Sequence, residues 1–203
     1  MAKLLILFAH PALEKSRIHR TLIRNLHELP GLTFHDLYEA YPSFNIDVQY
    51  EQSLLGAHDI IIWQHPFFWY STPALLKQWE DLVLEHGWAY GAAGTALKGK
   101  YLLSIITAGG GASAYQHQGY NRFTIRELLT PLEQTATLCK MTYLSPLVFH
   151  GAHRMREDDI TQAAALYHHV LTLLHDDTLD LEALLRFPTL NDALAQKQHE
   201  VPA

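Results

Sequence analysis

The chain has 203 residues, of which 48% are apolar and 18% are charged, so it carries enough apolar material for the core of one domain of ordinary size. That composition excludes a disordered or collagen-like chain, and the net charge of −6 argues against binding of nucleic acid through a broad cationic face. The lone cysteine, Cys139, excludes an intramolecular disulfide and favours a reducing compartment.

The N-terminal residues predict a cytoplasmic protein. The first apolar run, Leu4–Phe8, is far shorter than the roughly 18–20 residues that cross a bilayer. The start at Met1 carries neither the long apolar stretch nor the cleavage site of a signal peptide.

Short apolar runs alternate with stretches of helical periodicity along the chain. The runs predict strands buried on both faces, and apolar residues at about 3.6-residue spacing predict amphipathic helices. In chain order we expect a strand over 3–9, a helix over 16–29, an edge strand over 32–37, a helix over 47–56, a strand over 59–64, a helix over 73–87, a strand over 101–107, a helix over 123–129, a second helix from 130, a strand over 141–149 and a helix over 158–175.

Punctuating residues predict where some helices begin and end. Pro30 and Gly31 stop the first helix, and Pro73 suits the first position of another. Thr130, Pro131 and Glu133 have the order of an N-cap, a first-position proline and a capping-box glutamate, so we expect a helix break there.

Five strands with helices between them predict an α/β fold with a parallel sheet covered on both faces. The lengths suit the flavodoxin-like strand order 2-1-3-4-5, in which ligands bind beyond the carboxyl ends of the strands. We expect one flavodoxin-like domain over residues 1–175 and a C-terminal extension over 176–203 that packs against the body or a partner chain.

The loop after the first strand, residues 10–19, suits a phosphate. Ser16 and His19 supply side-chain donors, and Lys15 and Arg17 supply positive charge. A G-x-G-x-x-G fingerprint is absent, which argues against a Rossmann dinucleotide site. The alternative is an ordinary capped surface helix.

Two further loops follow buried strands. Residues 67–70 are four consecutive aromatic residues, which suit a flat aromatic ligand; a small hydrophobic cluster or a dimer contact is the alternative. Residues 109–111 are three glycines, which let the backbone approach a ligand closely; a flexible turn is the alternative.

Several motifs, in this order and spacing, carry a resemblance to a known family. They are Ala9-His10-Pro11 with Ser16, Trp63-Gln64-His65-Pro66 with Trp69-Tyr70-Ser71, Pro73-Ala74-Leu75-Leu76-Lys77, His86-Gly87-Trp88-Ala89-Tyr90-Gly91, Gly94-Thr95-Ala96-Leu97, Thr107-Ala108-Gly109-Gly110 and 41–47. From about residue 3 to about 175 the chain resembles the flavodoxin-like NAD(P)H quinone reductases of the DT-diaphorase type. It is most similar to the branch of ancillary oxidoreductases of bacterial glutathione-regulated potassium efflux systems.

The resemblance implies a bound flavin, FMN or alternatively FAD, with NADH or NADPH as co-substrate. On the phosphate side it implies His10, Ser16, Arg17, Ile18 and His19. Beside the flavin ring it implies Pro66, Phe67, Phe68, Trp69, Thr107, Ala108, Gly109 and Gly110.

The resemblance also implies catalytic and substrate-binding residues. Tyr115 falls on the family tyrosine that bonds near the flavin, and Asn121 stands where the animal enzymes have a histidine, so a histidine proton relay is in doubt. Trp69 and Tyr70 are expected to contact the substrate, together with Tyr90 from the second subunit of a homodimer.

We therefore hypothesise a ping-pong cycle in one pocket, in which hydride passes from NAD(P)H to the flavin N5 and then to a quinone. The alternative is a regulatory subunit that binds and activates a potassium efflux antiporter, with catalysis secondary. Such a partner would hold this cytoplasmic protein at the inner membrane.

Fourteen histidines raise the question of a metal site. His150 and His153 are three residues apart, but no cysteine cluster or H-E-x-x-H motif accompanies them. Adjacent His168 and His169 do not share one face of a helix. We expect no metal site.

Overall fold

The computed structural model describes residues 1–200, and the side chains of residues 1–196. Its centre is one parallel sheet with the strand order β2-β1-β3-β4-β5, and β6 also pairs with β4. This confirms the predicted order. The strands are β1 Leu4–Phe8, β2 Leu32–Asp36, β3 Ile60–Pro66, β4 Tyr101–Ala108, β5 Thr142–Tyr143 and β6 Leu147–His150.

The prediction of one last strand over 141–149 is wrong, because the segment is divided in two. β5 pairs with the start of β4 and β6 with its end. Between them Pro146 has no N–H for the ladder. The hydroxyl of Ser145 donates instead to the carbonyls of Leu184 (3.0 Å) and Phe187 (2.7 Å).

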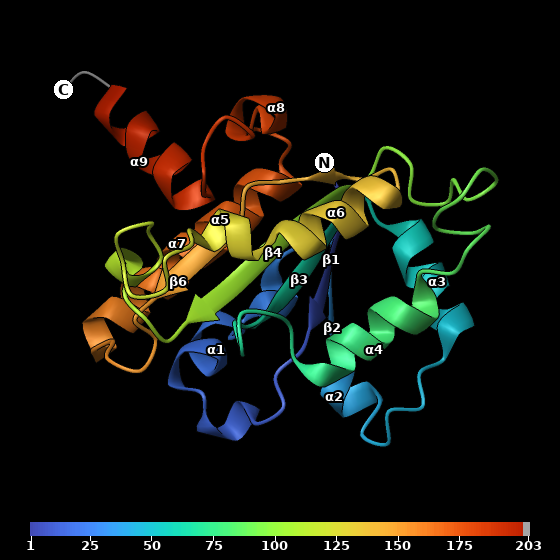
Figure 1. The fold of residues 1–203 in the computed structure, drawn as a ribbon, viewed down its shortest axis with the longest axis horizontal. Coiled ribbons are helices and arrows are strands. Elements are labelled where there is room, and N and C mark those ends of the chain that lie inside the picture. The colour runs from blue at the N-terminus through green and yellow to red at the C-terminus, as the bar shows by residue number, and fades with distance from the viewer. Residues whose placement is uncertain (201–203) are drawn as a thin grey trace.

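Helices cover both faces of the sheet. The helices are α1 Arg17–Leu22, α2 Leu37–Ala40, α3 Val48–Ala57, α4 Ala74–Val83, α5 Ile125–Leu128, α6 Thr130–Leu138, α7 Glu157–His175, α8 Leu181–Leu184 and α9 Leu190–Glu200. Successive strand residues point to opposite faces. Leu5 and Leu7 therefore pack with α3, α4, α5 and α6, whereas Leu4 and Ile6 pack with α1, α7, α8 and α9. Figure 1 shows α4 and α6 on one side of the sheet and α7 on the other.

Some helix ends differ from the prediction. The first helix stops at Leu22, because Asn25 adopts a left-handed φ of 63°, which asparagine tolerates, and a 3₁₀ turn follows at Leu26–Glu28. Pro73 is the residue before α4, and α4 ends at Val83, short of the predicted end at Gly87.

The break before Pro131 is confirmed, but its capping chemistry is different. Thr124 and Glu127 form the capping box, which opens α5. Thr130 is the first residue of α6, and its hydroxyl donates to the carbonyl of Glu127 at 2.8 Å, so it links the two helices and caps neither.

Beyond α7, the segment 176–196 lies against the body of this chain. Leu184 and Leu190 are buried in the cluster that contains α1 and α7. Within the part of the chain that the structure describes, no helix is long and apolar enough to cross a membrane.

Candidate functional site

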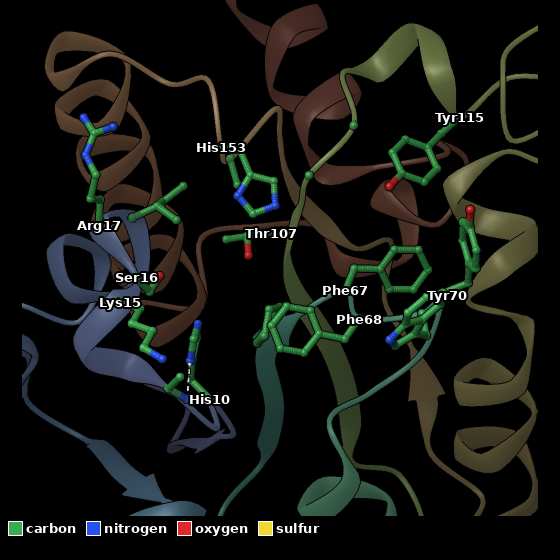
Figure 2. Close-up of a pocket in the computed structure, with 17 residues that line it drawn as sticks. His10, Lys15, Ser16, Arg17, Phe67, Phe68, Tyr70, Thr107, Tyr115 and His153 are labelled. Atoms are coloured by element: carbon green, nitrogen blue, oxygen red, sulfur yellow. Dashed lines mark hydrogen bonds between the residues drawn. The ribbon is translucent and has the colours of Figure 1, made fainter.

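A cavity of about 640 Å³ opens at the carboxyl ends of β1, β3 and β4. All three predicted loops line it, together with residues 152–153 from the loop between β6 and α7. Figure 2 shows polar and charged side chains at one end of this cavity and aromatic side chains at the other. The size is that of a site for a small molecule or cofactor.

Local hydrogen bonds shape the polar end. Ser16 is the N-cap of α1, where its Oγ accepts a hydrogen bond from the N–H of His19 at 3.1 Å. His10 Nδ1 accepts from the N–H of Ala12 at 3.1 Å. Burial lowers the pKa of His10, so its ring is neutral near pH 7. Ile18 also lines this end.

Two cations stand at the polar end, and they differ in what they contact. Arg17 donates to the Glu157 carboxylate at 2.7 Å and to the Met155 carbonyl at 3.2 Å, both on the segment that leads into α7. Lys15 Nζ has no hydrogen-bond or ion-pair partner within residues 1–196. Lys15 is therefore the cation available to an anionic ligand.

His19 lies behind the cavity wall and does not line the cavity. Its Nε2 pairs with Thr107 Oγ1 at 3.0 Å, which ties α1 to the end of β4. Burial, and then the neighbouring His10 and His65, lower the pKa of His19 well below its usual value. The neutral ring thus fixes Thr107, which does line the cavity.

A strained turn carries the aromatic loop. The N–H of Ser71 donates to the carbonyl of Phe68 at 2.9 Å, and the two central residues, Trp69 and Tyr70, have φ of 49° and 62°. Such backbone is costly for bulky residues and is concentrated at functional sites. The turn leaves the Trp69 side chain 94% exposed.

Three aromatic rings meet at this end of the cavity. Phe67 lies 6.3 Å from Tyr70 and 6.3 Å from Tyr115 between ring centroids. Burial raises the pKa of Tyr115, so its phenol is a neutral donor at pH 7. Asn121 does not line the cavity; its Oδ1 accepts a hydrogen bond from the Tyr70 hydroxyl at 3.1 Å.

The two residues that follow β4 leave no room for side chains. A Cβ on Gly109 would lie 2.9 Å from the His153 ring, and one on Gly110 would lie 3.2 Å from the Tyr115 ring. Ala108 is fully buried, and its carbonyl accepts from the N–H of Ala152 at 3.0 Å. Gly109 and Gly110 therefore line the cavity through their backbone, whereas Ala108, which the resemblance places beside the flavin ring, does not line it.

His153 and Ala152 line the cavity from the loop after β6 and are not among the predicted site residues. A general rule could have indicated them, since all strands of a parallel sheet end at the same edge. Tyr90 does not line the cavity of this chain; it packs on His86 at 5.4 Å. Among the described residues, no group of three or more metal-ligating side chains is arranged to hold a metal ion.

Residues 2–171 match the family model of the flavodoxin-like fold. The chain belongs to the flavodoxin-like fold family. One similar protein is the glutathione-regulated potassium-efflux system ancillary protein KefG of Pectobacterium carotovorum. The two sequences are 44% identical over 165 residues, which cover 81% of this chain and 90% of that protein. KefG similarity and the fold together confirm the predicted resemblance.

Solved structures of the family superimpose on this chain. General stress protein 14 of Treponema denticola, in complex with FMN, has a TM-score of 0.79 at 38% identity and covers 85% of this chain and 99% of its own. An NADPH-quinone reductase of P. pentosaceus has a TM-score of 0.74 at 35% identity, with 81% and 95% covered. A chain described as a thermophilic tryptophan halogenase from Streptomycin violaceusniger has a TM-score of 0.79 at 43% identity, with 81% and 95% covered. The three proteins carry descriptions of different activities. The property that all of them share with this chain is therefore the fold.

Proposed function

We propose that this family member is an FMN-dependent NAD(P)H:quinone oxidoreductase that works as a homodimer. The observation that carries the proposal is that the two ends of one cavity differ in chemistry. One end has a cation, Lys15, that no other described residue pairs with, and the other end has an aromatic wall with a phenol donor. A flat ring system with an anionic tail matches both ends.

The polar end would hold the phosphate of the flavin. Lys15 supplies a charge that has no competing partner within residues 1–196, and the hydroxyl of Ser16, whose oxygen already accepts from His19, can donate outward. Arg17 contributes charge while its guanidinium stays fixed on Glu157. FAD is the alternative cofactor.

The aromatic end would bind the ring and the substrate. The bound flavin supplies the ability to accept and pass on a hydride. Phe67, Phe68 and Trp69 offer rings for stacking, and Tyr115 can donate a hydrogen bond to negative charge that develops on the reacting ring. Asn121 holds Tyr70 in place through the hydrogen bond at 3.1 Å.

A second copy of the chain would complete the pocket. Aromatic side chains that line the cavity remain exposed, since Trp69 is 94% exposed, Tyr70 48% and Phe68 42%. Exposed apolar patches of this kind mark interaction sites. The partner's surface around its own Tyr90 would then close the substrate site.

A second function is favoured by the similarity to KefG. That relative is described as an ancillary protein of a potassium efflux system. The proposed partner is a potassium efflux antiporter, which would place a cytoplasmic protein at the inner membrane. In this proposal residues 1–175 form the flavin-binding domain, and 176–203 are the extension.

Purification and steady-state kinetics test the proposal. Flavin released by acid should be FMN on chromatography, and initial rates with varied NADH or NADPH and a benzoquinone should give the parallel double-reciprocal lines of a ping-pong cycle. A protein that binds flavin but reduces no quinone, and that is isolated with an efflux antiporter, would favour the second function. A protein that binds no flavin would contradict the first.

A further inference from the structure

The C-terminal segment 176–196 is fastened to the edge of β6. Asn191 in α9 accepts from the N–H of Val148 at 2.9 Å and donates to its carbonyl at 3.1 Å. Leu190 N–H donates to the carbonyl of Pro146 at 2.9 Å. The amide of Asn191 thus takes the place of a neighbouring strand at an otherwise unpaired sheet edge. The start of α9 is therefore bonded to Val148, which lies two positions before His150, the last residue of β6.

The last residue of β6 is His150, and it lies against Tyr115. The two rings are 5.5 Å apart between centroids at an interplanar angle of 43°. On another side the Tyr115 ring rests on Gly110, whose carbonyl accepts from the N–H of Gly151 at 2.9 Å. Tyr115 is therefore placed by Gly110 and His150, and Figure 2 shows its hydroxyl turned toward the cavity.

A carboxylate of the same C-terminal segment also acts on the His150 ring. Burial lowers the pKa of His150, whereas the carbonyl of Gly110 and the carboxylate of Asp192 oppose that change. The Asp192 carboxylate is held in place, since it accepts from the Thr189 hydroxyl at 2.7 Å. His150 Nδ1 is buried and has no hydrogen-bond partner among the described residues.

We propose that His150 is a positioning residue for Tyr115, and that the segment 176–196 holds His150 in place through the two bonds of Asn191 to Val148. The inference rests on the proposed function, in which Tyr115 faces the reacting ring. It extends the site beyond the family match, which ends at residue 171.

Nuclear magnetic resonance on the full chain without ligand tests the role of the segment. Asn191→Ala removes both bonds to Val148, so β6 loses this fastening and the Tyr115 ring resonances should move. Glu182→Gln changes an exposed side chain of α8 in the same segment and should leave those resonances in place. Tyr115 resonances that stay in place in Asn191→Ala would overturn the role of the segment.

The same spectra and the kinetics of the FMN-loaded protein test the positioning. His150→Leu should move the Tyr115 ring resonances and lower kcat with a benzoquinone by about two- to tenfold, the range expected for one aromatic contact. His150→Phe keeps a ring and should recover most of that loss. Tyr115 resonances that stay in place in His150→Leu would overturn the positioning role. If the resonances move as expected but the wild type reduces no quinone, only the proposed function fails.

Discussion

The two ends of the cavity are built in opposite ways. At the polar end, buried groups support the wall from behind: His19 is 1% exposed and pairs with Thr107, and Ser16 caps α1. At the aromatic end, Trp69 stands 94% exposed on a strained turn. The polar end therefore combines stability with binding, whereas the aromatic end keeps a surface available at a cost in backbone energy. Variants at the two ends should therefore separate effects on stability from effects on binding.

Acid should cause the largest loss of stability, through His65 in β3. His65 is fully buried, and burial lowers its pKa from 6.5 to about 4. The unfolded chain binds the proton first as pH falls, so stability present above about pH 6.5 is lost between there and pH 4. At about 1.4 kcal/mol per unit of pKa the loss is roughly 3 kcal/mol. Urea unfolding at pH 7 and pH 4.5 measures it, and His65→Leu should be less sensitive to this acidification.

The bond between His19 and Thr107 should be the next largest contribution. His19→Leu leaves the Thr107 hydroxyl buried without its partner, which should cost about 1–3 kcal/mol of unfolding free energy. Thr107→Val in the same chain removes the unpaired hydroxyl and should recover part of that loss. Denaturant unfolding of the two single variants and the double variant gives the coupling energy. Additive effects would show that the bond contributes nothing.

Lys15 should affect ligand binding at the polar end without affecting stability. Lys15→Gln should weaken FMN binding by about five- to tenfold, or about 1 kcal/mol for an exposed charge-assisted bond. Riboflavin lacks the phosphate, so its binding should not change. Lys98→Gln, an exposed lysine that does not line the cavity, is the matched control. Equal weakening of both flavins would place the phosphate elsewhere.

Trp69 should affect substrate binding at the aromatic end, also with little effect on stability. Glycine relieves the positive φ of the turn and loses little burial, so Trp69→Gly should change the free energy of unfolding by less than about 1 kcal/mol, because the relief of strain is offset by the backbone entropy of glycine. The KM for a benzoquinone should rise. A large loss of stability would show that the exposed ring is structural.

Asn121 should give the smallest effect. Asn121→Ala removes the hydrogen bond from the Tyr70 hydroxyl. Because Tyr70 is partly exposed, the free energy of unfolding should fall by about 0.5 kcal/mol or less. A change in kcat as large as that of Tyr115→Phe would instead make Asn121 a direct participant in the reaction.

The sequence predicts the sheet well, because buried parallel strands are continuous apolar runs. The run 60–63 and the run 4–8 therefore locate β3 and β1 closely. The division of the last strand was missed, since it depends on Ser145 bonding to residues about forty positions away. The helix ends that were predicted wrongly depend on the local backbone conformation, such as the left-handed φ of Asn25.

The candidate site was predicted in part. The loops that follow β1, β3 and β4 line one cavity, because strand order fixes which loops converge. The position of His19 behind Thr107 and the ion pair of Arg17 with Glu157 could not be predicted, since both depend on long-range packing. The same holds for His153, which the sequence pairs with His150 as a possible metal ligand and does not connect with the three loops.

Titration of the flavin-free protein with FMN, followed by quenching of flavin fluorescence, tests the central claim most directly. The account predicts saturable binding of one FMN per chain, with riboflavin bound more weakly. Absence of quenching, or binding that ignores both Lys15→Gln and Trp69→Gly, would contradict the claim that this cavity is a flavin site.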